Sequence, residues 1–153
     1  MSFVVDAVGH VRGGRFEAGD DDWGASLARI ELDAGRFAPA ALAGLGEFSH
    51  AEIIYLFDRL GEDEIELGAR HPRGRADWPL VGIFAQRGRN RPSRLGCSIC
   101  RVVKVDGLHL HVEGLDALDG TPVLDIKPVL TGFLPRGEVR EPAWAAEIMK
   151  DYW

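Results

Sequence analysis

The feature that most restricts the fold of this chain is a hairpin pattern at residues 103–112. Apolar and polar side chains alternate there on both sides of the dipeptide Asp106-Gly107. An Asp-Gly pair between two alternating runs is typical of a tight hairpin turn, because both central residues of such a turn favour positive φ. We therefore predict two antiparallel β-strands, with His109 and His111 on the face opposite the leucines and exposed to solvent.

Alternation elsewhere predicts a fold built mainly from strands. Residues 28–32 have the pattern of a half-buried strand, and residues 50–57 that of a well-buried one. Further strands are expected at residues 3–8, 64–69, 80–85 and 123–127. Helix is scarce, with one short helix expected at residues 38–43 and another at residues 143–153, after Pro142.

Seven to eight short strands separated by glycine and proline turns predict a small closed β-barrel with a short C-terminal helix. With 153 residues, the chain is expected to form a single domain over residues 1–153. No Gly-x-Gly-x-x-Gly follows a strand and opens a helix, so the sequence does not support a Rossmann fold.

Basic residues are concentrated in one segment of an acidic chain. The net charge is −6, from 18 basic and 24 acidic side chains. Residues 70–94 hold seven arginines and a single acid, Asp77, so this segment carries +6 and the remainder −12. Such a distribution suits a polyanion or an anionic ligand, because the acidic remainder repels that partner elsewhere. The net charge therefore does not exclude a nucleic-acid partner.

The sequence lacks the marks of a secreted or membrane protein. Its apolar runs fall far short of the roughly 20 residues that span a bilayer, and no positive segment precedes a hydrophobic one near residue 1. Cys97 and Cys100 form a single C-x-x-C pair, and residues three apart on a strand point to opposite faces. We expect a cytoplasmic protein without a membrane partner, with structural cysteines and no metal.

Two segments concentrate polar side chains. Residues 86–94 form a predicted loop that carries Arg87, Arg89, Arg91 and Arg94. Holding these like charges together costs free energy unless an anion offsets them, so the loop is a candidate anion site.

The second segment, residues 115–128, sets Asp116, Asp119 and Asp125 around a Gly-Thr-Pro turn. Lys127 lies on the same strand face as Asp125, so the two form either a simple ion pair or a site that positions a polar ligand. His50, outside this segment, is either a core histidine or a site residue.

Three blocks of the chain resemble the TrmO/TsaA-like (YaeB-like) family of S-adenosylmethionine-dependent tRNA methyltransferases. Residues 44–50 read GLGEFSH, residues 82–98 read GIFAQRGRNRPSRLGCS, and residues 114–128 read GLDALDGTPVLDIKP. The last block is long and nearly identical to the family pattern. The middle block departs from it at Gln86, at Gly88-Arg89 and at Ser93.

The resemblance implies a compact β-barrel homodimer that binds S-adenosylmethionine near the subunit interface. It also implies methylation of threonylcarbamoyl-adenosine beside the anticodon of a tRNA. The cofactor-binding residues carried over from the family are Asp58, Arg59, Arg87, Cys97, Asp116, Ala117, Leu118, Asp119 and Thr121. Arg89, Arg91 and Arg94 are expected to hold tRNA phosphates.

Asp125 and Lys127 are the candidate catalytic residues, which would orient the nucleophile. Two alternative functions remain open because pocket motifs depart from the family pattern. One is a non-catalytic barrel that binds S-adenosylmethionine or RNA, and the other is a small-molecule methyltransferase of a divergent branch.

Overall fold

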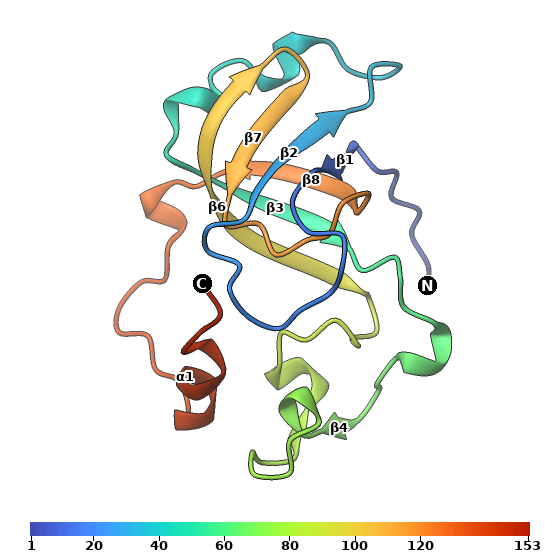
Figure 1. The fold of residues 1–153 in the computed structure, drawn as a ribbon, viewed down its shortest axis with the longest axis vertical. Helices are drawn as coiled ribbons and strands as arrows, with labels where there is room; N and C mark the ends of the chain where they lie inside the picture. Colours follow the sequence, from blue (N-terminus) through green and yellow to red (C-terminus); the bar gives the residue numbers. More distant parts are fainter.

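The computed structural model describes residues 1–153 and contains a closed six-stranded barrel with strand order β1-β2-β7-β6-β3-β8 (Figure 1). All neighbouring strands in the barrel run antiparallel. The strands are β1 (Gly9–Arg12), β2 (Leu27–Leu32), β3 (His50–Leu56), β6 (Leu95–Asp106), β7 (His109–Glu113) and β8 (Pro122–Pro128). The predicted mainly β barrel is confirmed, although the barrel has fewer strands than the seven to eight expected.

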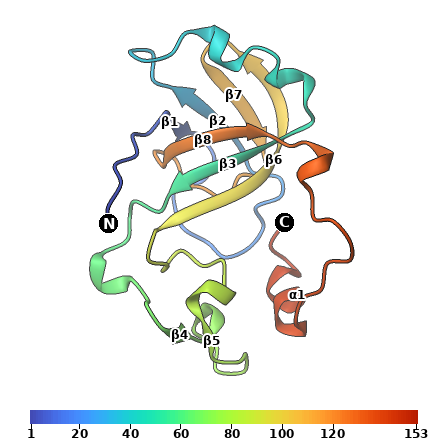
Figure 2. The ribbon, with the colours of Figure 1, turned by 180° about the vertical axis from the view of Figure 1, so that it is seen from behind.

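The remaining elements lie outside the barrel. Strands β4 (Ala69–Arg70) and β5 (Val81–Gly82) pair as a separate ribbon, which projects from one end of the barrel near the single α-helix, α1 (Ala143–Met149) (Figure 2). Short 3₁₀ turns connect the strands: η1 (Pro39–Leu42), η2 (Leu45–Glu47), η3 (Glu62–Glu64), η4 (Pro72–Gly74), η5 (Ile83–Ala85) and η6 (Thr131–Phe133). None of the helices has the length and the apolar composition of a membrane-spanning segment.

The core fills the barrel interior with alternate residues of every strand. Val11, Ile30, Ile53, Leu110 and Val123 come from five different strands and are fully buried. Because successive strand residues point to opposite faces, the residues between them are left on the outer surface. This alternation places one set of side chains inside the barrel and a second, more polar set outside it.

The predicted hairpin is confirmed, but its turn is shifted by one residue. Asp106 pairs with His109, so the two-residue loop consists of Gly107 and Leu108. Gly107 has φ +60°, and Leu108 does not have positive φ. Glycine at the first central position is typical of a type II′ turn, so the expectation that Asp106 occupies a central position was wrong. His109 and His111 lie on the outer face, as predicted.

Strands at residues 28–32, 50–57 and 123–127 are confirmed with small shifts of their ends. The strand predicted at residues 3–8 is absent, because backbone pairing with β8 begins only at its end, where the Val8 N–H donates to the Val123 carbonyl and Gly9 lies opposite Val123. Residues 3–5 pair with no strand, and they are exposed.

Two further strand predictions were largely wrong. In residues 64–69 the Glu66 carboxylate accepts a hydrogen bond from the Gly68 backbone N–H, which makes a turn, and pairing begins only at Ala69. In residues 80–85, pairing stops at Gly82 and a 3₁₀ turn follows.

The helix predictions hold in a shorter form. The segment at residues 38–43 is the 3₁₀ turn η1. The C-terminal helix ends at Met149, before the predicted residue 153. The residues after the helix bind the connection between β1 and β2 instead. The backbone N–H groups of Asp22 and Trp23 donate to the carbonyls of Asp151 and Tyr152.

Candidate functional site

One carboxylate, that of Asp116, accepts hydrogen bonds from three hydroxyl groups. Tyr55 Oη donates to Asp116 Oδ1 at 2.9 Å, Ser98 Oγ donates to the same oxygen, and Tyr152 Oη donates to Oδ2. These donors come from β3, from β6 and from the segment after α1. The strands and the C-terminal segment thus meet at the loop that joins β7 to β8.

The carboxylate of Asp116 has no cationic partner within ion-pair distance. Burial and the nearby negative charge of Asp116 raise the pKa of Tyr55 well above its ordinary value, and the same two causes raise the pKa of Tyr152. Both phenols therefore remain neutral donors at physiological pH. A half-buried negative charge held only by neutral hydroxyls is suited to a cationic ligand.

A second set of predicted residues lies beside Ser98 on β6. Arg87 Nη2 donates to the Cys97 carbonyl oxygen at 2.6 Å, and Cys97 Sγ donates to Glu52 Oε1 at 3.0 Å. Burial and Glu52 raise the pKa of the Cys97 thiol to about 11. The side chain is therefore a neutral thiol and not a nucleophilic thiolate.

Cys100 points away from Cys97, as predicted for residues three apart on a strand. It is 1% exposed within the core, whereas Cys97 is only partly buried, and both are free thiols. Burial raises the pKa of Cys100 to about 12, with a smaller contribution from Asp116. No group of three or more histidine, cysteine or acidic side chains has the geometry of a metal site.

A third set of predicted residues surrounds Asp119. Arg59 Nη2 donates to the Asp119 carbonyl at 2.6 Å, and the Gly13 backbone N–H donates to Asp119 Oδ1 at 2.8 Å. In the same loop, Ala117 and Thr121 are buried and Leu118 is partly buried. Asp58, beside Arg59, is exposed.

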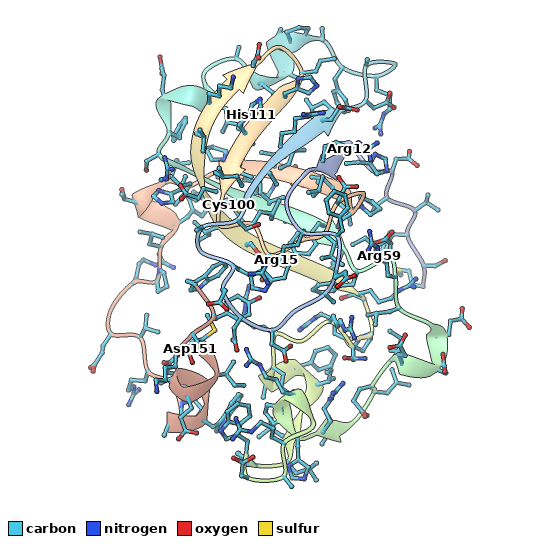
Figure 3. All side chains as sticks on the ribbon, viewed as in Figure 1. Arg12, Arg15, Arg59, Cys100, His111 and Asp151 are labelled. Carbon is cyan, nitrogen blue, oxygen red and sulfur yellow. The ribbon has the colours of Figure 1, made fainter.

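Figure 3 shows Arg15, Arg59 and Asp151 toward the end of the barrel from which the β4–β5 ribbon projects. His111 lies toward the opposite end of the barrel. The Asp116 and Asp119 sets therefore share one end of the barrel, because a single loop, residues 114–121, carries both.

The loop arginines form no ion pair with any carboxylate. Arg91 Nη1 donates to the Gln86 carbonyl at 2.9 Å, and Arg94 Nη1 donates to the Leu60 carbonyl at 3.5 Å. Arg89 is exposed. Two other arginines of residues 70–94 are neutralised, Arg73 by Asp21 and Arg75 by Asp77. The uncompensated positive charge is thus concentrated in the loop at residues 86–94.

Asp125 and Lys127 form an ion pair at 2.5 Å on the outer face of the barrel. Asp125 lies opposite Ile54, and Ile54 lies opposite Cys97, so the three form one row across β8, β3 and β6. This row is separate from Asp116, whose donor Tyr55 points into the barrel. The structure brings the predicted catalytic pair near Cys97 but does not join it to the Asp116 network.

Sequence reasoning missed three members of the Asp116 network: Tyr55, Ser98 and Tyr152. The alternation in β3 and β6 places Tyr55 and Ser98 on the inner face, which is a usable signal for the first two. Tyr152 is 36 residues from Asp116 and carries no such signal.

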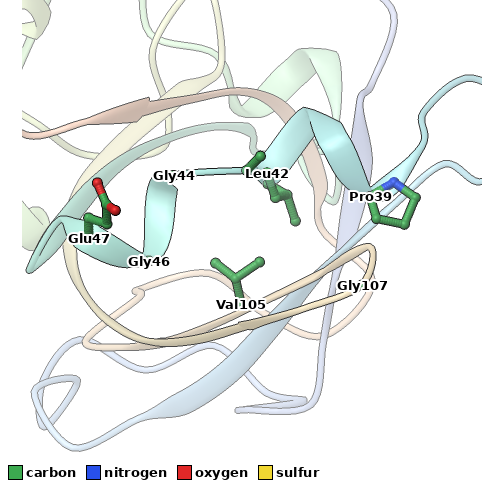
Figure 4. Close-up of a pocket in the computed structure, with 8 residues that line it drawn as sticks. Pro39, Leu42, Gly44, Gly46, Glu47, Val105 and Gly107 are labelled. Atoms are coloured by element: carbon green, nitrogen blue, oxygen red, sulfur yellow. The ribbon is translucent and has the colours of Figure 1, made fainter.

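A shallow depression of about 320 Å³ lies elsewhere, between η1, η2 and the β6–β7 hairpin (Figure 4). Leu42 and Val105 face one another across it, and Glu47 is its single charged side chain. None of the predicted site residues lines it.

Comparison with known proteins identifies the family to which the chain belongs. Residues 22–133 match the family model described as the tRNA-methyltransferase O N-terminal domain. The chain is 43% identical over 88 residues to a putative S-adenosylmethionine-dependent methyltransferase, RcsF, of Pseudomonas aeruginosa, a match that covers 58% of this chain and 36% of that protein. It is 33% identical over 102 residues to the human tRNA (adenine(37)-N6)-methyltransferase, covering 67% of this chain and 23% of that protein.

The fold agrees with a solved structure. The crystal structure of TrmO from Pseudomonas aeruginosa superposes with a TM-score of 0.73 at 28% sequence identity, covering 92% of this chain and 62% of that one. The chain thus spans less than two thirds of each relative named here. The matched segment contains every predicted site residue, and the chain belongs to the tRNA-methyltransferase O N-terminal domain family.

Proposed function

We propose that the protein is a methyltransferase that uses S-adenosylmethionine to methylate a modified adenosine of tRNA, threonylcarbamoyl-adenosine beside the anticodon. One observation carries the proposal: an uncompensated carboxylate and an uncompensated arginine loop flank the same strand, β6. A cofactor with a positive and a negative group requires both partners. The names of the relatives point to the same cofactor and to tRNA.

The residues present fit that cofactor. The Arg87 guanidinium is exposed and forms no ion pair, so it is free to bind the cofactor carboxylate. Asp116 would face its ammonium group, and the loop at residues 116–119, with Asp58, Arg59, Cys97 and Thr121, would contact its remaining polar atoms. S-adenosylmethionine supplies an electrophilic methyl group on a sulfonium.

Arg89, Arg91 and Arg94 are proposed to bind tRNA phosphates. Backbone phosphates account for much of the affinity in protein–nucleic acid complexes, and arginine binds them through paired N–H donors. Backbone carbonyls partly fix Arg91 and Arg94, so their side chains lose less conformational entropy when they bind a phosphate.

Asp125 and Lys127 are proposed to orient the nucleophile. Methyl transfer depends mainly on an in-line approach at about 3–3.5 Å, so positioning supplies most of the catalysis. The ion pair fixes both side chains, and the row through Ile54 to Cys97 puts them on a surface that Arg87 borders.

The assembly proposed is a cytoplasmic homodimer that acts without a metal. The outer face of β6 exposes Leu95 and Ile99, which are 42% and 48% exposed. Covering this apolar face with a second subunit would remove these side chains from water. It would also place the Asp125 row at the interface.

A non-catalytic barrel that binds S-adenosylmethionine is the second candidate. One observation favours it: the proposed catalytic groups Asp125 and Lys127 bind one another. Nucleoside analysis separates the two functions. Mass spectrometry of tRNA from cells lacking the protein is expected to show one methylated adenosine missing, whereas an unchanged nucleoside profile favours the binding module.

Calorimetry tests the cofactor directly. The wild-type protein is expected to give saturable heat with S-adenosylmethionine below about 100 µM. Arg87→Ala should weaken binding about tenfold or more, since it removes a charge-assisted pair. Arg75→Ala, which removes a guanidinium already paired with Asp77, is the matched control and should bind as wild type does. Absence of heat with the wild-type protein would contradict the proposed cofactor.

A further inference from the structure

We infer that Tyr152 is a positioning residue of the cofactor site and acts through Asp116, an inference that rests on the proposed function. Tyr152 lies outside the family-model match, which ends at residue 133. Its hydroxyl group nevertheless donates to Asp116 Oδ2, on the side opposite the oxygen that binds Tyr55 and Ser98. The segment after α1 therefore supplies one third of the donors that hold this carboxylate.

The backbone of the segment that carries Tyr152 is anchored to the connection between β1 and β2. The Trp23 backbone N–H donates to the Tyr152 carbonyl at 2.7 Å, and the Asp22 N–H donates to the Asp151 carbonyl at 2.9 Å. At Gly24 there is no room for a side chain, because a Cβ there would lie 2.6 Å from the Trp153 backbone carbon. The backbone around Tyr152 is thus fixed against residues 22–24.

Helix α1 is held independently. Trp78 Nε1 donates to Glu147 Oε2 at 2.7 Å, and Arg73 Nη2 donates to the Ile148 carbonyl at 3.4 Å. Both partners belong to residues 70–94, the segment that also carries Arg87. The C-terminal segment therefore links the arginine-rich segment to Asp116. The C-terminal segment is therefore a fixed part of the site, and the cofactor does not displace it.

The hydroxyl group has a defined task at this position. Tyr55 and Ser98 both bind Oδ1, so without Tyr152 nothing in the protein holds Oδ2. A carboxylate fixed at only one oxygen rotates about its terminal bond, and the direction of its charge toward a ligand changes. Burial and Asp116 raise the pKa of Tyr152, so the phenol stays a donor over the physiological range. Precise orientation of a binding group by such supporting contacts determines ligand affinity.

A double-mutant cycle tests the inference. The full-length proteins compared are wild type, Tyr152→Phe, Asp116→Asn and the double variant, with S-adenosylmethionine affinity measured by calorimetry. Tyr152→Phe keeps the ring and should weaken binding about tenfold, the loss expected for one hydrogen bond to a charged group. In the Asp116→Asn background the same change should have less than about a twofold effect, because Tyr152 acts only through Asp116.

Two further variants separate positioning from general stability. Gly24→Ala displaces the segment without altering Tyr152 or Asp116 and should also weaken binding. Asp151→Asn changes the neighbouring exposed side chain and should leave the affinity and the thermal midpoint unchanged. The affinity of Tyr152→Phe is measured at a temperature at which its thermal unfolding curve shows it fully folded, so that partial unfolding does not account for the loss of affinity.

Each other outcome overturns the inference in a recognisable way. Affinity of Tyr152→Phe within twofold of wild type, or additive effects in the cycle, would remove Tyr152 from the site. Tighter binding by Tyr152→Phe or Gly24→Ala would show that the segment blocks the site. Failure of the wild-type protein to bind S-adenosylmethionine would instead refute the proposed function, and this inference with it.

Discussion

Replacing Asp116 with alanine removes the single acceptor that three hydroxyl groups share. Hydrogen bonds to charged groups contribute about 1.5–3 kcal/mol each, and a buried donor left without a partner costs about 1–3 kcal/mol. The three losses are not additive here. Tyr55 Oη keeps the Asp116 carbonyl at 3.1 Å and Ser98 Oγ at 3.4 Å, and Tyr152 is open enough to bind water.

Loss of the half-buried charge itself offsets part of the cost, since an ion is expensive to remove from water. The net loss in unfolding free energy expected for Asp116→Ala is therefore about 2–3 kcal/mol, close to the value for one charged hydrogen bond. For a chain of this size that corresponds to a fall of about 5–10 °C in the thermal midpoint.

The assay is urea unfolding at 25 °C and pH 7, followed by circular dichroism. Asp125→Ala is the matched control, because it deletes an aspartate from an exposed ion pair and should cost less than about 1 kcal/mol. A loss below about 0.5 kcal/mol for Asp116→Ala, or a loss equal to that of the control, would refute the reasoning that Asp116 organises this end of the barrel.

Three further predictions concern RNA binding, alkaline stability and packing. Arg89→Ala should reduce the slope of log affinity for tRNA against log salt by about 0.7–0.9, the value for one lost phosphate contact; an unchanged slope in a binding titration would exclude that contact. Folding raises the pKa of Tyr55 above 10.0 and that of Cys100 from 9.0 to about 12, so the unfolded chain releases these protons first. The free energy of unfolding should therefore be intact below pH 9 and fall above it, by about 1.4 kcal/mol per pH unit for each group once its unfolded form has ionised. Tyr55→Phe should make the fall above pH 10 less steep in urea titrations. An unchanged slope of unfolding free energy against pH would contradict the raised pKa of Tyr55. Gly96→Ala places a Cβ 2.3 Å from the Tyr55 ring and should cost about 1–3 kcal/mol in the same urea assay, whereas Gly88→Ala, which meets no atom within 4 Å, should not.

The barrel strands could be predicted because alternation records directly which side chains face the core. In β3 and in β7, every second residue is buried, so the sequence pattern and the structure carry the same information. The segment at residues 3–8 shows what the pattern omits. An extended apolar run becomes a strand only where its backbone pairs with a neighbouring strand, and here the pairing with β8 begins only at Val8 and Gly9.

The candidate site was predicted only in part for a similar reason. The arginine loop and the loop at residues 114–121 are local in sequence, so their composition was visible. The residues that distant segments contribute to the site could not be identified from the sequence. Asp21 neutralises Arg73 across 52 residues, and Tyr152 binds Asp116 across 36, and no spacing rule links either pair. The hydroxyl network was therefore found only in the folded structure.

Transfer of an isotopically labelled methyl group tests the central claim most directly. Purified protein is incubated with S-adenosylmethionine labelled in its methyl group and with tRNA that carries the modified adenosine, and the digested nucleosides are then analysed by mass spectrometry. The proposed function predicts the label in that one nucleoside, with transfer reduced for Arg87→Ala and for Asp116→Asn. Bound S-adenosylmethionine with no labelled nucleoside at any protein concentration would contradict it.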